Sequence, residues 1–179
     1  MSFPRRELRR AYDRDAGAYD ARFRALQAPK LAAVLARYRP ARGARVGDLG
    51  CGTGLLLEAL EEGGPLDPQP LLLDLSAGML SRVPAGRARR VQGDLTRLPL
   101  RDGCLDAAFA ITSLLGARGE VLAALLEVRR VLVPGGTLAL TLLASELWAG
   151  VEADLAACGL RPGAPFACGQ DRGWICARA

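Results

Sequence analysis

Short apolar runs alternate with segments of helical periodicity from residue 44 to the end of the chain. This alternation predicts a mostly parallel sheet, because parallel neighbours must be joined by a crossover segment, usually a helix. We expect strands at residues 44–49, 71–73, 90–92, 105–111, 137–143, 160–168 and 172–177. The helices between them are expected at residues 54–62, 76–82, 120–132 and 146–158. The sequence therefore predicts an α/β fold whose seven-stranded sheet is covered by helices on both faces and closes with an antiparallel C-terminal strand.

The N-terminal segment predicts helices that precede this sheet. Apolar residues recur at close to helical spacing from Leu8 to Leu26, with a break expected at Gly17. Pro29 suits the first turn of a second helical piece, which Pro40 would end. The length fits one domain. We expect a single domain of residues 1–179, made of an N-terminal helical lid at 1–43 and a core at 44–179.

Composition and charge exclude some classes of protein. No stretch approaches the roughly 20 uninterrupted apolar residues of a membrane span, so no membrane partner is expected. The first 14 residues are rich in arginine and lack the apolar stretch of a secretion signal, which favours a cytoplasmic location. The net charge is +5, with arginine clusters at residues 5–14 and 87–90. Such clusters are able to bind nucleic acid, but acids interleave the first one, which favours a solvated helix face.

The cysteines do not predict a metal site. The chain has five cysteines and no histidine, and no pair of cysteines is spaced C-x-x-C. We therefore expect no metal and mostly buried, reduced thiols. A Cys168–Cys176 bridge across a terminal hairpin is left open.

A glycine-rich turn joins the first predicted strand to the helix after it. Three glycines of the turn Gly50-Cys51-Gly52-Thr53-Gly54 allow tight bending and let a ligand approach the backbone. The N–H groups at the start of the helix favour a carboxylate. The second strand ends in Asp74, whose carboxylate is suited to accept hydrogen bonds from both hydroxyls of a ribose. The alternatives are a tight turn without a ligand and an Asp74 that caps the helix beginning near Ser76.

Two further acids stand at the ends of predicted strands. Asp94 follows the third strand, where its carboxylate would accept a hydrogen bond from an exocyclic adenine amine, or would be an ordinary loop acid. Asp106 opens the fourth strand and is expected to have a structural role. Because ligands of open α/β sheets bind beyond the carboxyl ends of the strands, Asp74 and Asp94 are the better candidates for a binding site.

These segments resemble, in order and spacing, the motifs of class I S-adenosylmethionine-dependent methyltransferases. Residues 46–54 read VGDLGCGTG and resemble the family's first motif, VLDLGCGTG. Residues 73–80, 92–106 and 129–136 are similar to its later motifs, so that the resemblance covers about residues 44–143. The Tyr12-Asp13 and Tyr19-Asp20 pairs resemble the lead-in of small-molecule members, among them the quinone-biosynthesis branch. The resemblance implies a Rossmann-like fold, S-adenosyl-L-methionine as cofactor, and methyl transfer.

The resemblance also assigns roles to residues of this chain. The methionine end of the cofactor would be held by the first motif, through Asp48, Gly50, Cys51 and Gly52. Asp74 would bind the ribose. The adenine would lie among Leu75, Met79, Gly93, Asp94 and Leu95. Ile111 and Thr112 would line the space near the sulfonium, and Tyr19 would close over the cofactor from the N-terminal helices.

The catalytic residue is left unassigned by the sequence. Methyl transfer is a displacement on a carbon already activated by positive sulfur, and a base is needed only if the acceptor must lose a proton. The segment after the fourth strand lacks the histidine that many relatives carry there, which leaves the catalytic chemistry in doubt. The candidates near the expected site are Tyr12, Asp13, Tyr19 and Ser113, and each also reads as a packing, capping or solvated residue.

The sequence argues against some classes of methyl acceptor. Residues 111–114 lack the Asn/Asp-Pro-Pro-aromatic run of adenine methyltransferases, and no cysteine follows a proline there as in cytosine C5 enzymes. A small molecule is therefore expected, with a protein side chain or terminus as the alternative and nucleic acid disfavoured. A non-catalytic relative that binds the cofactor is a third interpretation. An NAD(P)-binding oxidoreductase is less favoured, because the glycines are spaced G-x-G-x-G and residue 55 is Leu.

Overall fold

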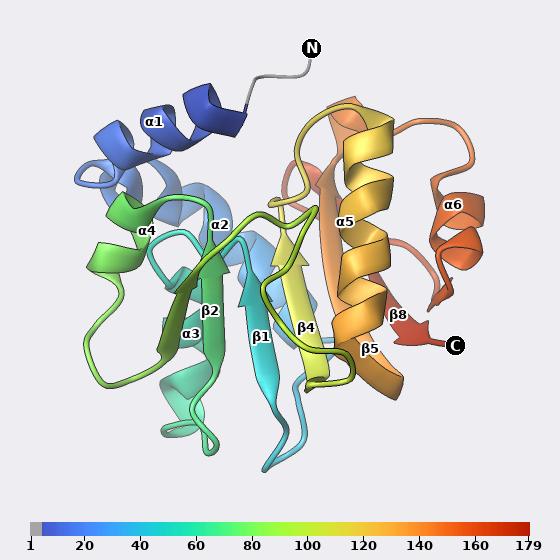
Figure 1. The fold of residues 1–179 in the computed structure, drawn as a ribbon, viewed down its shortest axis with the longest axis horizontal. Helices are drawn as coiled ribbons and strands as arrows, with labels where there is room; N and C mark the ends of the chain where they lie inside the picture. Colours follow the sequence, from blue (N-terminus) through green and yellow to red (C-terminus); the bar gives the residue numbers. More distant parts are fainter. Residues whose placement is uncertain (1–4) are drawn as a thin grey trace.

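The computed structural model describes residues 5–179, which form one sheet with helices on both faces (Figure 1). The strands are β1 (Val46–Leu49), β2 (Leu71–Asp74), β3 (Arg89–Gln92), β4 (Leu105–Ile111), β5 (Leu132–Leu143), β6 (Leu160–Pro162), β7 (Phe166–Cys168) and β8 (Asp171–Arg178). The α-helices are α1 (Arg5–Asp15), α2 (Tyr19–Leu35), α3 (Leu55–Leu60), α4 (Ala77–Arg82), α5 (Arg118–Val131) and α6 (Val151–Ala157). Short 3-10 helices follow α3 and β5, at Glu61–Gly63 and Ala144–Glu146.

The strand order confirms the predicted mostly parallel α/β sheet. Within residues 5–179 the eight strands run in the order β3-β2-β1-β4-β5-β8-β6, and β7 also pairs with β8. The five strands β1 to β5 are parallel, whereas β8 is antiparallel to β5. The order reverses direction beside β1, since β2 lies on one side of it and β4 on the other. Ligands of such sheets bind at the carboxyl ends of the strands flanking this switch point.

Two apolar layers cover the sheet because alternate residues of a strand face opposite sides. On one face Ala108 and Ala110 of β4 pack in the same cluster as Leu125 of α5 and Leu155 of α6. On the other face Phe109 belongs to a cluster that includes the apolar side of α2 and α3. Nearly all of these side chains are fully buried, so the central strands are fixed from both sides and their carboxyl ends are held in place.

The N-terminal region differs from the prediction at one proline. The break expected at Gly17 is present, since α1 ends at Asp15 and α2 begins at Tyr19. Pro29 does not begin a second helical piece but lies inside α2. The cost of proline inside a helix is offset here because the C-terminal half of α2 buries its apolar residues against the sheet. Residues 1–4 of the predicted lid lie outside the described residues.

The C-terminal region shows two further corrections. The helix predicted at residues 146–158 is shorter, because the 3-10 helix Ala144–Glu146 and Gly150, with φ of +83°, precede α6. The single strand predicted at 160–168 is divided into β6 and β7, both antiparallel to β8. Residues 163–165 separate the two strands. Pro162 precedes this segment and Pro165 lies within it, and neither proline has an N–H to donate to a neighbouring strand.

The five cysteines are free, so the Cys168–Cys176 bridge is not formed. Cys168 lies opposite Asp171 in the β7–β8 pair, whereas Cys176 lies opposite Pro162 and Leu138. Within the described residues, no group of three or more histidine, cysteine or acidic side chains is arranged to hold a metal ion. The helices of this part of the chain are too short or too polar to cross a membrane.

Candidate functional site

A cleft opens at the switch point of the sheet, lined by residues of α1 and α2 and of the loops after the strands. Figure 1 shows that the carboxyl ends of β1, β2 and β4 lie at the same end of the sheet as α1. The cavity volume of the cleft is about 90 Å³. The residues that line it come from the N-terminal helices and from the loops after the strands: Arg5, Leu8, Tyr12, Tyr19, Gln27, Gly50, Gly52, Asp74, Leu75, Met79, Asp94, Leu95, Ile111, Thr112, Ser113 and Leu115. Most of the sequence-predicted candidates therefore converge on this cleft.

The glycine-rich turn forms the floor of the cleft. Gly50 and Gly52 have φ of +82° and +54°, in the left-handed region that favours glycine. A Cβ on Gly50 would lie 2.3 Å from the Cβ of Ser113, so a larger residue would collide with the loop after β4. The N–H groups of Gly50 and Cys51 donate to the carbonyl oxygen of Leu73, at 2.7 and 3.0 Å. The turn is thereby fixed against the end of β2.

Asp74 stands at the end of β2 with both carboxylate oxygens oriented by backbone donors. The N–H of Gly52 donates to Oδ2 and the N–H of Ser76 donates to Oδ1, each at 2.8 Å. The cap of α4 is Ser76 itself, whose Oγ accepts from the N–H of Met79, so Asp74 is not the capping residue. Burial raises the pKa of Asp74, and these N–H donors oppose the rise. Each carboxylate oxygen still has a lone pair for a ligand.

Asp48 is buried behind the glycine turn and lacks a partner for one oxygen. Its side chain lines a small hollow that shares Tyr19, Gly50 and Gly52 with the cleft. No described residue forms a hydrogen bond with its Oδ2. Burial, and then the charge of Asp74, raises the pKa of Asp48 to about 8. A buried carboxyl group without a partner is costly, so this atom indicates that a cationic or hydrogen-bonding group belongs beside it.

The N-terminal helices are fastened to the loops of the cleft. Asp13 of α1 accepts from the Oγ of Ser76 at 2.6 Å and from the N–H of Gly78 at 2.9 Å. Thr53 donates its hydroxyl to Asp20 of α2 at 2.5 Å. The contacts therefore reach from both helices to the glycine turn and to the start of α4.

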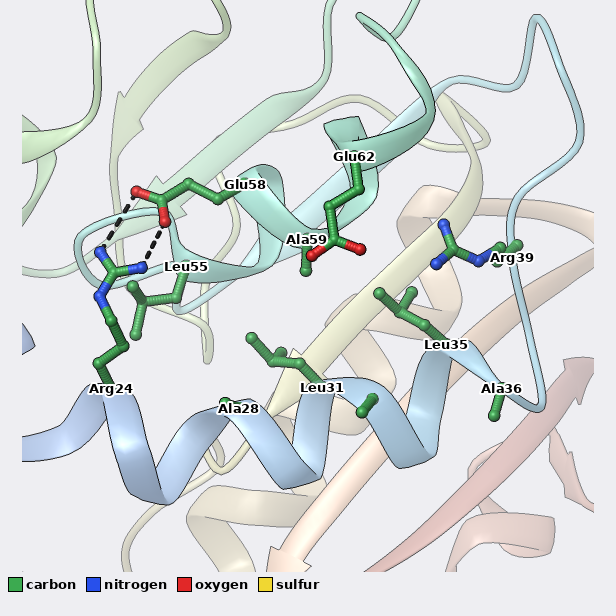
Figure 2. A pocket seen from close by; sticks show the side chains of 11 residues that line it. Arg24, Ala28, Leu31, Leu35, Ala36, Arg39, Leu55, Glu58, Ala59 and Glu62 are labelled. Atoms are coloured by element: carbon green, nitrogen blue, oxygen red, sulfur yellow. Dashed lines mark hydrogen bonds and ion pairs between the residues drawn. The ribbon is translucent and has the colours of Figure 1, made fainter.

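A second connection joins α2 to α3 beside the cleft. Figure 2 shows Arg24 of α2 paired with Glu58 of α3, and Leu31 directed toward the space between the two helices. The hollow between them is larger than the cleft, about 570 Å³, but neither Gly50 nor Asp74 lines it. The candidate site is therefore the smaller cleft at the strand ends, where the polar groups converge.

The predicted catalytic candidates are engaged in other interactions. Ser113 donates its hydroxyl to the carbonyl oxygen of Leu49 at 2.6 Å. The hydrogen bonds from Ser76 and Gly78 lower the pKa of Asp13, so this carboxylate is a weak base. Burial raises the pKa of Tyr12 and of Tyr19, which opposes formation of a phenolate. None of these four side chains is therefore arranged as a strong general base.

The remaining predicted residues divide between the cleft and its surroundings. Cys51 lines the small hollow with Asp48, whereas Gly93 lines neither space and lies against Leu73 and Pro99. Asp94 lines the cleft, and its Oδ1 accepts from the N–H and the hydroxyl of Thr96, both at 2.8 Å. Its Oδ2 lies 3.5 Å from Nε of Arg5.

Four residues of the cleft were not predicted from the sequence. They are Arg5, Leu8, Gln27 and Leu115. Arg5 and Leu8 precede Tyr12 at helical spacing, and Gln27 follows Tyr19 by eight residues, so each shares a helix face with a predicted site residue. Extending the two tyrosine faces along their helices would have found three of the four.

Comparisons with known proteins agree with this geometry. The methyltransferase domain family matches residues 47–140, more than half of the chain. The chain belongs to this methyltransferase family. The resemblance to class I S-adenosylmethionine-dependent methyltransferases is thereby confirmed, and S-adenosylmethionine is the cofactor of the class.

Two curated methyltransferases are similar to this chain over part of their length. A malonyl-[acyl-carrier protein] O-methyltransferase from Pectobacterium atrosepticum is 33% identical over 80% of the chain and 55% of the relative. A demethylmenaquinone methyltransferase from Beutenbergia cavernae is 37% identical over 62% of the chain and 45% of the relative. The chain therefore spans about half the length of these relatives.

A solved structure shares the fold at low sequence identity. A Haloferax volcanii chain described as a methyltransferase, solved in complex with a methyltransferase activator, superposes with a TM-score of 0.83. It is 19% identical, and the match covers 95% of this methyltransferase and 96% of that chain. The unpartnered Oδ2 of Asp48, in the hollow that Gly50 and Gly52 also line, fits an ammonium group such as that of the methionine end of the cofactor.

Proposed function

We propose that this methyltransferase binds S-adenosylmethionine in the cleft and transfers its methyl group to a small-molecule acceptor. The observation that carries the proposal is the buried Oδ2 of Asp48, which lacks a hydrogen-bond partner among the described residues and lies behind Gly50 and Gly52. The ammonium group of the cofactor's methionine end would neutralise this carboxylate and supply the missing partner of Oδ2.

The other end of the cleft supports a nucleoside. Asp74, oriented by its two backbone donors, would bind the ribose hydroxyls. Leu75 and Met79 would flank the adenine, while Asp94 and Leu95 would contact its edge. When bound, the cofactor supplies an electrophilic methyl group on positively charged sulfur. Ile111 and Thr112 would line the space around that methyl group and exclude water from it.

We also propose that residues 1–43 act as the lid of this site. The cavity of about 90 Å³ is smaller than the roughly 300–1,000 Å³ typical of ligand pockets, because Tyr12 and Tyr19 contribute to its walls. A Cβ on Gly52 would lie 3.8 Å from the ring of Tyr19, which places this ring directly over the glycine turn. Entry of the cofactor would therefore require α1 and the start of α2 to move outward.

An acceptor would enter through a neighbouring hollow of about 470 Å³ that shares Arg5, Leu8 and Leu115 with the cleft. Its other walls include Leu143 of β5 and the loop after β4. An acceptor that is already ionised needs no protein base, which suits a site whose Ser113 and Asp13 are engaged elsewhere. The relatives are named for two acceptor types, a malonyl thioester and a quinone precursor. The lack of a free protein base among the described residues of the cleft favours the malonyl carboxylate, which is already ionised.

Calorimetry with S-adenosylhomocysteine tests the cofactor site. Asp74→Ala should abolish measurable binding while the protein remains folded. The matched control is Asp102→Ala, because Asp102 is 80% exposed and precedes β4 at the opposite edge of the sheet. Equal affinity of the Asp74→Ala variant and the parent would refute the ribose assignment, and preferential binding of NADH would favour an oxidoreductase.

Transfer of a labelled methyl group tests the acceptor. The parent protein should methylate a malonyl thioester carried by acyl-carrier protein, with the corresponding succinyl thioester as a control for chain length. Label in a quinone precursor would instead support the second acceptor type. Label on a protein side chain or terminus, rather than on a carried acyl group, would contradict the small-molecule proposal. The absence of transfer despite cofactor binding would favour a non-catalytic binding protein.

A further inference from the structure

A buried ion pair lies beneath the cleft and has no part in the function proposed above. The Nζ of Lys30 in α2 lies 2.8 Å from Oδ1 of Asp171 at the start of β8. The two side chains are 6% and 0% exposed. Lys30 is the single lysine of the chain, whereas the other positive charges are arginines. A buried pair of this kind must overcome a large desolvation penalty, so its location is informative.

The pair is connected to the end of β4 through Thr112. Lys30 Nζ donates to the hydroxyl oxygen of Thr112 at 3.0 Å, and that hydroxyl donates to Oδ2 of Asp171. Thr141 of β5 donates its hydroxyl to the same Oδ2 at 2.7 Å. The N–H of Thr112 lies 2.9 Å from the hydroxyl oxygen of Thr141. The polar hydrogens of Thr112 are therefore directed into this network.

Thr112 has an unfavourable backbone conformation. Its φ of +52° is the one positive value at a non-glycine residue within residues 5–179. A β-branched residue in this region is strained, and such strain persists only where surrounding contacts impose it. Thr112 also lines the cleft, between Ile111 and Ser113. The strained residue is thus part of the wall that the function proposed above assigns to the reacting methyl group.

We propose that Lys30 and Asp171 are positioning residues that impose the left-handed conformation of Thr112. The Thr112 hydroxyl accepts a hydrogen bond from Lys30 and donates one to Asp171. These two bonds fix the shape of the cleft wall at the end of β4. Since Lys30 belongs to α2, the same contacts tie an N-terminal helix to the floor of the site. The effect on cofactor binding rests on the proposed function, whereas the effect on the Thr112 backbone does not.

The test uses the double variant Lys30→Met/Asp171→Asn, which removes both charges together and leaves no buried charge unpaired. Nuclear magnetic resonance of the free protein, through the ¹³C shifts and the HN–Hα coupling of Thr112, reports its φ. The parent should show the left-handed conformation and the double variant an extended one. The control is Arg45→Met/Asp106→Asn, because this ion pair of 2.8 Å lies at the opposite end of β4. The control should leave φ of Thr112 unchanged.

The second readout is the affinity for S-adenosylhomocysteine. The double variant should bind about tenfold more weakly than the parent, which corresponds to about 1.4 kcal/mol. Adding Thr112→Gly should bring the affinity to within about threefold of the Thr112→Gly single variant, because glycine adopts positive φ without a restraint. A merely stabilising ion pair would not be rescued in this way.

Two outcomes would overturn the inference. One is an unchanged φ of Thr112 in the double variant, whatever the cofactor affinity. The other is a loss of affinity that Thr112→Gly does not relieve, since the pair would then act through general stability. A changed φ in a protein whose parent does not bind S-adenosylhomocysteine would support the positioning role and refute the proposed function instead. If the double variant does not fold, Thr141→Val removes one support of the network and should shift φ of Thr112 in the same direction.

Discussion

The buried carboxyl group of Asp48 makes the stability of the free protein depend on pH. Burial, and then the charge of Asp74, raises the pKa of Asp48 to about 8 in the folded protein, whereas an unfolded aspartate titrates near pH 3.9. Between these values the folded protein holds a proton that the unfolded chain has lost. The group therefore destabilises the fold as pH rises, by about 1.4 kcal/mol per pH unit, or on the order of 5 kcal/mol over the whole interval.

Replacing this carboxyl group by an amide should remove the dependence. Asp48→Asn keeps the shape of the side chain and cannot ionise. Its gain in unfolding free energy over the parent should be roughly 4 kcal/mol greater at pH 8 than at pH 5. Urea denaturation of both proteins at the two pH values measures this difference. The same gain at both values would show that Asp48 titrates at an ordinary pKa and would refute the interpretation of its burial.

The same substitution should act in the opposite direction on cofactor binding. An ammonium group beside Asp48 would favour its ionised form, so binding at pH 7 should release a proton from a carboxyl group whose pKa is about 8. Calorimetry of S-adenosylhomocysteine binding in buffers of different ionisation enthalpy detects this proton. The release should disappear in Asp48→Asn, and the affinity should fall. An Asp48→Asn protein that is more stable and binds as tightly as the parent would place the ammonium elsewhere.

Three further substitutions test neighbouring parts of the structure. Asp94→Ala should weaken S-adenosylhomocysteine binding by about 1.5–3 kcal/mol, the range of a hydrogen bond to a charged group, and unchanged affinity in calorimetry would contradict the adenine contact. Gly50→Ala should lower both stability in urea and cofactor affinity, because the added Cβ would lie 2.3 Å from the Cβ of Ser113 and the backbone has φ of +82°; a variant with parental stability would contradict the collision. The guanidinium of Arg45 lowers the pKa of Asp106 to about 2, so the stability that this pair contributes should be lost as pH falls from about 4 to 2, and acid unfolding of Asp106→Asn should lack that step.

The fold was predictable where the sequence pattern and the tertiary environment agree. The strand predicted at residues 105–111 has the observed bounds of β4, because its apolar run is buried on both faces and begins just after the turn at Gly103. The prediction failed at Pro29, where local preference favoured a helix start and burial of the following apolar residues kept the helix continuous. The prediction failed again at residues 160–168, where prolines interrupt the apolar run. This segment forms two strands, β6 and β7, whose division depends on how each pairs with β8. Local signals therefore locate elements better than they locate their ends.

The candidate site was predictable from one property of parallel sheets. Asp48, Asp74 and Asp94 lie at or beyond the carboxyl ends of strands, and these ends meet at one edge. The sequence could not show which sides of α1 and α2 face that edge, since the angle of a helix to the sheet depends on contacts such as that of Asp13 with Gly78. Arg5 and Gln27 could be inferred only by extending the predicted faces of Tyr12 and Tyr19 along their helices.

The network around Lys30 could not be predicted, because its members come from three separate elements and from the loop after β4. Lys30 and Asp171 are 141 positions apart in the sequence, and neither stands in a recognisable motif. A buried ion pair is often replaced by apolar residues at no cost in stability, so packing alone does not require one here. Its contact with the single strained non-glycine residue of the described chain is what distinguishes it from an ordinary structural pair. The strained backbone of Thr112 needs a restraint from outside the loop, and the Lys30–Asp171 pair provides it at the wall of the cleft. This role gives a reason for a buried ion pair that packing alone does not require.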